Sequence, residues 1–208
     1  MSRTGLSITP GCIVVSWLLL APAAARGQAC AEPHYRWSEK VDSTLQTRPA
    51  TPVDITAVLT AWAPLSLTSS DMCAPRAGRE DSVFVLVGWV RRLRLQESDG
   101  DWHVELTEAR ATPVDSCIIV EIPAERYGGI YRQARSALAR LVDTTQLGPR
   151  GDLRPPVLVR FTGAAFFDGF HQRAAADGSH FASQHGRCNS SLRALWELHA
   201  VYGVAAPG

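Results

Sequence analysis

The sequence predicts a mainly β protein built on a five-stranded, OB-fold-like Greek-key barrel, with one helix between strands three and four. From residue 82 onward the expected elements run strand, strand, strand, helix, strand, strand, which is the order of an OB-fold. The turn "ESDGD" joins the first two strands directly and leaves no room for the helix that a ferredoxin-like fold needs there. Another small β-rich barrel is the remaining alternative.

Residues 1–29 have the layout of a secretory signal peptide. The apolar run Cys12–Ala25 is too short to span a bilayer as a mature helix, and "GQA" (27–29) is an acceptable cleavage site. An N-terminal membrane anchor and a lipoprotein attached through Cys30 are the alternatives. Gly27 disfavours the lipoprotein, because a lipobox has Leu or Val at that position. We therefore expect a secreted or periplasmic protein with no membrane span once the signal is removed.

The charge balance argues against a nucleic-acid partner. The chain has 21 Lys and Arg and 20 Asp and Glu, and residues 1–29 contain two of the basic residues and no acid, so 19 face 20 in the remainder. Duplex-binding proteins usually carry a clear basic excess. We interpret the run "RRLR" (Arg91–Arg94) as a solvated strand end rather than a phosphate site. An unidentified ligand or an envelope protein is the expected partner.

Cysteine usage agrees with export. Cys12 leaves with the signal, and an even number of cysteines remains, with no C-x-x-C pair that would indicate a zinc knuckle or a redox motif. Cys117 opens the third strand and Cys188 shortly precedes the fifth, and these two strands run parallel in an OB-fold. The sequence therefore favours the pairs Cys117–Cys188 and Cys30–Cys73.

The segment 30–81 is predicted to be a loop-rich N-terminal extension, because it is rich in Pro, Thr and Ser. Its one organised piece is a short helix over Val53–Ala61, where apolar residues recur at four-residue spacing. Thr51 is the candidate cap, and Pro52 suits the first turn. The expected organisation is a signal peptide, this extension and an OB-fold-like domain, at residues 1–29, 30–81 and 82–204.

The predicted barrel begins with a long strand that contains Gly88, where a barrel strand often bends. The second strand alternates strictly, with Trp102, Val104 and Leu106 on one face. Apolar residues then recur at helical spacing over Ile130–Val142. The strands are expected at residues 82–96, 102–109, 116–123, 156–167 and 194–204.

Strand alternation places several acids and histidines on the face opposite the apolar residues. Because strand three of an OB-fold pairs with strands two and five, His103, Glu121 and His199 are expected to approach one another. Asp168 and His171 follow strand four on a glycine-containing turn. We term these residues the candidate polar cluster; its members are Asp101, His103, Glu121, Asp168, His171, Glu197 and His199. Glu105 lies on the same face of the second strand as His103, because the two are two residues apart.

Three interpretations of the candidate polar cluster remain open: a divalent-metal site, a general acid–base pair, or polar groups that fix loops. The candidate metal ligands are His103, Glu121, Asp168, His171 and His199. The sequence contains no H-E-x-x-H pattern, G-x-S-x-G elbow, P-loop or Rossmann glycine fingerprint, so enzyme activity lacks support from motifs. His180 and His185 lie in the loop "DGSHFASQHGR" and are expected to be solvated.

Five short motifs spread over the chain resemble the motifs of a known protein family. They are "RWSEKVD", "DGDWHVEL", "VEIP", "TGAAFFDGFH" and "WELHAV", in this order between Trp37 and Val201. They are similar to a family of exported bacterial proteins whose chains contain a "W-x-x-K-T" start, "DGDYHL", "EIP", "GFFD-x-x-H" and "ELHPV". The resemblance implies export and an OB-fold-like domain, and it brings no activity with it. The chain departs from the family at Ala200, where the family has Pro, and in the longer segment Gln172–Asn189.

Together these observations predict an exported binding or accessory module of the cell envelope or the extracellular space, with an unidentified ligand. The first alternative is a metal-assisted hydrolase, with phosphodiesters as a candidate substrate class, which would use the His and carboxylate cluster. The second alternative is a purely structural domain. A divalent metal is the one cofactor that the candidate polar cluster suits.

Overall fold

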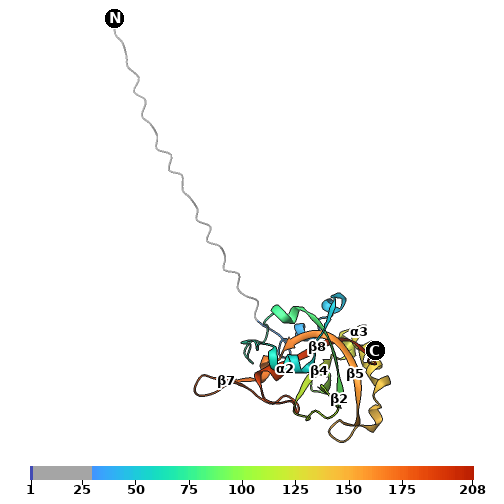
Figure 1. The fold of residues 1–208 in the computed structure, drawn as a ribbon. Coiled ribbons are helices and arrows are strands. Elements are labelled where there is room, and N and C mark those ends of the chain that lie inside the picture. Colours follow the sequence, from blue (N-terminus) through green and yellow to red (C-terminus); the bar gives the residue numbers. More distant parts are fainter. Residues whose placement is uncertain (2–29) are drawn as a thin grey trace.

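Most of the described chain folds around one mixed β-sheet (Figure 1). The structure, a computed structural model, describes Met1 and residues 30–208, and the rest of the predicted signal peptide lies outside the described residues. The strands are β1 (Ala50–Pro52), β2 (Val83–Arg94), β3 (Trp102–Thr107), β4 (Cys117–Ile122), β5 (Asp152–Phe167), β6 (Gln172–Ala174), β7 (His180–Ala182) and β8 (Trp196–Ala205). The α-helices are α1 (Trp37–Lys40), α2 (Ile55–Ala61) and α3 (Gly129–Leu141). Within the described part of the chain, no helix is both long enough and apolar enough to cross a membrane.

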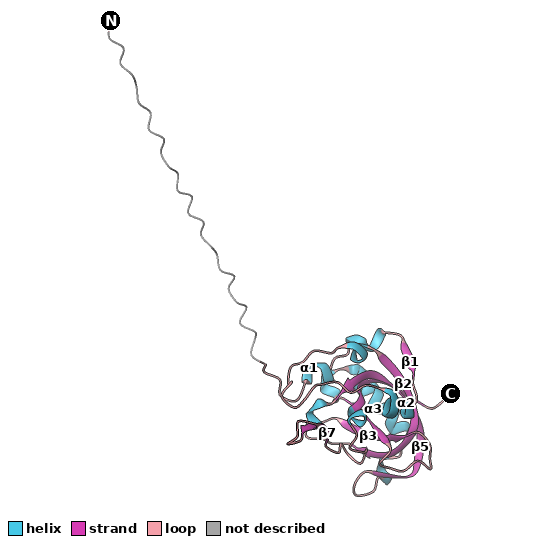
Figure 2. Cartoon of the chain, turned by 60° about the vertical axis from the view of Figure 1, so that its left-hand side comes forward, coloured by secondary structure: helices cyan, strands magenta, loops and turns pink. Residues whose placement is uncertain are grey.

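Five strands of the sheet close into a ring, because β2 pairs antiparallel with both β3 and β5. β3 pairs with β4, β4 lies parallel to β8, and β8 pairs antiparallel with β5. These are the neighbours that the predicted strand order requires. β1 adds to the sheet beside β2, in parallel orientation. α3 lies between β4 and β5 in the chain and packs against β8 (Figures 1 and 2).

The interior of the ring is filled by the apolar face of each strand, as alternation predicts. Val104 and Leu106 of β3, Val120 of β4 and Leu198 of β8 are all buried. The opposite face of β3 is buried too, which alternation alone does not predict. Its residue His103 is only 2% exposed. Later segments of the chain therefore cover the polar side of the sheet as well.

The helix of the N-terminal segment is shorter than predicted. α2 begins at Ile55, after Asp54 at the N-cap position, rather than at Val53. Thr51 and Pro52, expected to start the helix, belong instead to β1 and pair with β2. Backbone pairing with a neighbouring strand has therefore outweighed the local helix signals of these two residues.

Gly88 has a different role from the predicted one. The register of β2 shifts between Val90 and Arg92, so the irregularity of the strand lies beyond Gly88. A Cβ atom at Gly88 would lie 2.7 Å from Cδ1 of Ile55. The glycine thus allows α2 to pack closely against β2.

Several strand boundaries also differ from the prediction: β2, β3 and β4 are each about two or three residues shorter than expected, and β5 and β8 begin elsewhere. β5 begins at Asp152, four residues before the expected start, and its prolines lie at the register shift between β2 and β5, where no ladder N–H is needed. β8 begins at Trp196 rather than Ala194. Ala194 belongs to a 3-10 turn whose start is capped by Ser191, and the Ser191 Oγ accepts the Ala194 N–H at 3.3 Å.

A fully buried ion pair between Arg36 and Glu80 holds the N-terminal segment against the sheet. The Arg36 guanidinium donates two hydrogen bonds to the Glu80 carboxylate, at 2.8 and 2.9 Å, and three more to backbone carbonyls. Glu80 Oε1 also accepts the N–H of Phe167, the last residue of β5, at 2.9 Å. Because both charges have several hydrogen-bond partners, their burial is compensated. The pair fixes the point at which Asp168 leaves the sheet.

Two disulfides join Cys30 to Cys73 and Cys117 to Cys188, which is the pairing that the sequence favours. The first ties the start of the described chain to the loop before the 3-10 helix η2 (Gly78–Asp81). The second ties a late loop to the first residue of β4. The second therefore connects an irregular segment to a fixed point of the fold.

We expect the substitution Glu80→Gln to lower the free energy of unfolding by about 3–5 kcal/mol, because it leaves the Arg36 guanidinium buried without its counter-charge. The matched control is Glu125→Gln, whose partner Arg132 and own side chain are 66% and 51% exposed, and which should change stability by less than about 0.5 kcal/mol. Urea unfolding followed by tryptophan fluorescence measures both. Equal effects of the two substitutions would contradict the role given to the buried pair.

Candidate functional site

A chain of hydrogen-bonded charges runs along the polar face of β3, β4 and β8. His103 lies directly across from Glu121 in the strand register, and its Nδ1 is 2.8 Å from Glu121 Oε1. Glu121 Oε2 is 3.1 Å from Nδ1 of His199. Nε2 of His199 is 3.1 Å from Asp101 Oδ2, and Nδ1 of His199 is also 3.1 Å from Glu197 Oε1. Strand phase thus brings together five members of the candidate polar cluster.

The remaining two members, Asp168 and His171, lie at the end of β5. Asp168 caps a 3-10 turn, η5 (Gly169–His171), and its Oδ1 accepts the Phe170 N–H at 3.1 Å. Asp168 Oδ2 is 3.8 Å from Nε2 of His171 and 3.5 Å from Nζ of Lys40. Lys40 ends α1, so the N-terminal segment supplies a buried cation that strand phase did not predict.

His185 joins the site from residues 183–188, a segment that we term the strap. Its ring stacks on His171, with 4.3 Å between ring centroids, and meets His103 edge-on at 5.1 Å. The prediction that His185 is solvated is wrong, since its side chain is only 15% exposed. The disulfide at Cys188 and contacts of the strap with β3 bring it over the sheet. His180, by contrast, is exposed as predicted.

These side chains border a cavity of about 570 Å³. Its polar wall consists of Lys40, His103, Glu121, Asp168, His171 and His185. Tyr35 and Phe170 lie at the same cavity and give it an aromatic side, while Arg94 and Glu97 form an ion pair of 2.9 Å at its border. Asp101 and His199 do not line the cavity and are fully buried.

Two of the histidines carry charge at neutral pH. Burial opposes protonation of His103, but its contacts with Glu105 and Glu121 outweigh burial and raise its pKa to about 9. For His199, burial is likewise outweighed by three carboxylates, which raise the pKa well above the ordinary value. Burial also opposes ionisation of Glu121, yet His103 and His199 hold its pKa well below the ordinary value. From His103 through Glu121 to His199 the chain therefore alternates between imidazolium and carboxylate groups, whereas burial and the nearby Glu121 raise the pKa of Glu197 to about 7.

The other two histidines of the cavity are neutral. Burial lowers the pKa of His185 to about 3, because the nearby carboxylates compensate it only in part. Burial also lowers the pKa of His171, despite the proximity of Asp168. Burial alone would raise the pKa of Asp168, but Lys40 and the histidines lower it. Asp168, His171 and His185 thus offer one carboxylate and two neutral imidazoles, the protonation states that bind metal ions.

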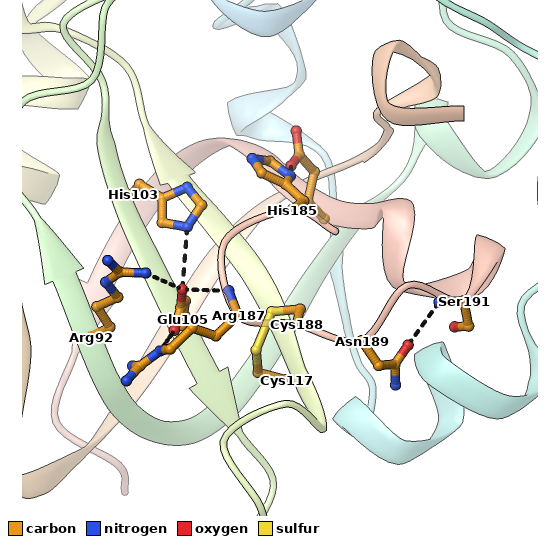
Figure 3. Close-up of a disulfide and its surroundings, with 10 residues drawn as sticks. Arg92, His103, Glu105, Cys117, His185, Arg187, Cys188, Asn189 and Ser191 are labelled. Carbon is orange, nitrogen blue, oxygen red and sulfur yellow. Dashed lines mark hydrogen bonds and ion pairs between the residues drawn. A yellow bond between two sulfur atoms is a disulfide. The ribbon is translucent and has the colours of Figure 1, made fainter. Parts of the chain in front are cut away.

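Glu105 anchors the strap (Figure 3). Its carboxylate accepts the backbone N–H of Arg187 at 2.9 Å, the Arg187 Nε–H at 2.6 Å and a hydrogen bond from Arg92 at 3.1 Å. Burial opposes ionisation of Glu105, but His103, Arg187 and Arg92 lower its pKa to about 2. The expectation that Arg92 belongs to a solvated strand end is therefore wrong, because its side chain is 14% exposed and paired.

Three groups of described residues offer ligand atoms within 4.8 Å of one another. They are His103, Glu121 and His185; Asp168, His171 and His185; and Asp101, Glu121 and His199. In the third group, Asp101 and His199 do not line the cavity, and both His199 nitrogens already hydrogen-bond Asp101 and Glu121. In the first group, His103 is held as an imidazolium by Glu121. The second group opens on the cavity with its imidazoles neutral.

Strand alternation and the turn after β5 predict the members of the candidate polar cluster, but they do not predict the groups that long-range contacts bring to it. Lys40 and Tyr35 carry no periodic signal, and His185 occurs in a segment without strand phase. Gly169 is needed for a reason other than the predicted turn. A Cβ atom there would lie 2.3 Å from the carbonyl oxygen of Leu67 and 2.6 Å from the hydroxyl of Tyr35.

Comparisons with known proteins add no assignment: no protein family model matches the chain, and no curated protein matches its sequence. The resemblance of the motifs to an exported bacterial family stays a prediction. Any functional conclusion therefore comes from the geometry and charge of the site.

We expect the metal-free protein to lose stability as pH rises from about 6.5 through about 9. The folded-state pKa of His103 is raised to about 9 from 6.5, so its stabilising contribution is complete below pH 6.5 and disappears above pH 9. His103→Gln should flatten this part of the profile, whereas His180→Gln, at an exposed position, should leave it unchanged. Thermal unfolding in EDTA between pH 5.5 and 9.5 measures the effect. A wild-type profile that rises with pH in this window would contradict the assignment.

Proposed function

We propose that this chain is an exported binding module whose ligand is a divalent transition-metal ion, held by Asp168, His171 and His185. One observation carries the proposal. Two imidazoles and a carboxylate, from two segments of the chain, offer ligand atoms within 4.8 Å of one another at the wall of a cavity. Ligands of a tetrahedral ion bound at 2.0–2.2 Å lie about 3.3 Å apart, so small side-chain rotations suffice to close the site. Imidazole with carboxylate suits Zn²⁺ and its transition-metal neighbours better than Ca²⁺ or Mg²⁺.

Two of these ligands have a second polar atom that would not bind the ion, and the hydrogen bonds made by those atoms support the assignment. Ser183 Oγ is 3.3 Å from Nδ1 of His171, which leaves Nε2 facing Asp168 at 3.8 Å. The Asp168 Oδ1 is occupied by the Phe170 N–H, so Oδ2 is the ligand atom. Metal-binding imidazoles and carboxylates are commonly oriented by such partners.

A metal-assisted hydrolase is the second candidate, and the size of the cavity favours it. A volume of about 570 Å³ is far larger than one ion with its remaining water ligands needs. Two histidines and one carboxylate leave coordination positions for water and a substrate atom. Tyr35 lines the same cavity, and its hydroxyl has no hydrogen-bond partner among the described residues. A purely structural role for the cluster is the outcome if no ion binds.

We also propose that the ring of five strands is an OB-fold barrel and that the protein is exported. The ring order β2-β3-β4-β8-β5, the parallel pair β4–β8 and the position of α3 support the fold assignment. Two disulfides support an oxidising compartment. The disulfide at Cys30 favours secretion over lipid attachment, because a lipid thioether would need the same sulfur atom.

We expect the purified chain to bind one Zn²⁺ and to gain about 5–10 °C in Tm when free Zn²⁺ exceeds Kd a hundredfold. His171→Ala should abolish this gain, because it removes one of three ligands. His180→Ala is the matched control, since His180 is an exposed histidine of the same region. Calorimetric titration and thermal unfolding measure affinity and stability together. A Tm that does not respond to Zn²⁺, Co²⁺ or Mn²⁺ would reject the metal and leave the structural role.

For export, we expect the chain expressed with residues 1–29 to be recovered outside the cytoplasm with Cys30 at or near its N-terminus. Intact-mass analysis of the exported, non-reduced material measures the cleavage site. The mass should also be four hydrogens lower than that of the reduced chain, because two disulfides form. Recovery of a chain that still begins at Met1 would contradict export by cleavage.

A further inference from the structure

The strap is a loop segment whose last three residues form a turn, and it has a fixed end. It follows β7 and ends at Cys188, whose disulfide to Cys117 attaches it to the start of β4. His185 lies between these points, three residues before the disulfide (Figure 3). The disulfide therefore limits how far His185 can move but does not set the backbone angles between residues 185 and 188.

A second anchor lies between His185 and the disulfide. Glu105 is fully buried and accepts the backbone N–H and the Nε–H of Arg187. Gly186 has φ +61° and lies so close that a Cβ atom there would be 2.5 Å from Glu105 Oε1. The carboxylate thus fixes the two residues that directly follow His185, both through the backbone and through close packing.

We propose that Glu105 is a positioning residue that holds His185 in place as a metal ligand. The inference rests on the proposed metal site at Asp168, His171 and His185. Glu105 does not line the cavity and so does not touch the ion. It acts through the strap, because it is the only carboxylate among the described residues that accepts the backbone N–H of Arg187.

A double-mutant cycle with Glu105→Gln and His185→Ala tests this inference. In a competition titration with Zn²⁺, Glu105→Gln should weaken binding by about 10–100-fold, the usual effect of losing a partner that orients a ligand. His185→Ala should weaken it at least as much. The double variant should bind no more weakly than His185→Ala alone. The visible absorption spectrum of the Co²⁺-loaded Glu105→Gln protein should shift toward that of His185→Ala, which a change in overall stability would not produce.

Two further variants keep the test decisive. Asp152→Asn is the matched control, because the Asp152 carboxylate pairs with Nη1 of Arg187 and not with its backbone, and its side chain is 30% exposed. The Zn²⁺ affinity of this variant should stay within about twofold of the wild-type value. If Glu105→Gln does not fold, Arg187→Ala replaces it and should give a smaller, equally non-additive loss. Full additivity with His185→Ala, or unchanged affinity, would overturn the role of Glu105 while the metal site stands. Absence of Zn²⁺ binding by the wild-type protein would overturn both.

Discussion

The constraint on which this structure depends is the burial of charge on the polar face of β3, β4 and β8. Glu121 lies between two imidazolium groups, His103 and His199, with distances of 2.8 and 3.1 Å. Burying such groups costs several kcal/mol per ion unless every one is paired. The strand register helps to satisfy this requirement, because His103 on β3 and Glu121 on β4 carry opposite charge and lie directly across from each other. The strap and the N-terminal segment can therefore cover this face.

The N-terminal segment takes part in the site as well as in the fold. Arg76 donates hydrogen bonds of 2.6 and 2.7 Å to backbone carbonyls of Ala165 on β5 and His199 on β8. Arg36 lies with its guanidinium 4.6 Å from the centroid of the Phe166 ring. These contacts hold α1 so that Lys40 reaches Asp168. In the metal-free protein, Lys40 thus provides the positive charge that a bound ion would bring to this carboxylate.

Strand phase allowed most of the candidate polar cluster to be predicted from the sequence, because alternation is a local property that pairing preserves. His103, Glu121 and His199 lie on one face for that reason. Long-range contacts could not be predicted in the same way. His185 is placed by a disulfide and by Glu105, and Lys40 by contacts that Arg36 and Arg76 make with strands far away in the chain, so neither position follows from its neighbours in sequence. Gly88 and Gly169 were recognised as glycines with a role, but each is required by a close approach of another segment rather than by a bend.

Two histidines, His103 and His199, hold the sheet face together, and two others, His171 and His185, are neutral and can bind an ion. Anomalous diffraction from crystals of the residue 30–208 protein grown with Zn²⁺ tests this separation most directly. We predict one peak about 2.0–2.2 Å from a carboxylate oxygen of Asp168 and from one nitrogen each of His171 and His185. His103 should remain hydrogen-bonded to Glu121 in the same crystals. A peak bound by His103 and Glu121, or the absence of any peak in the cavity at saturating Zn²⁺, would contradict the account.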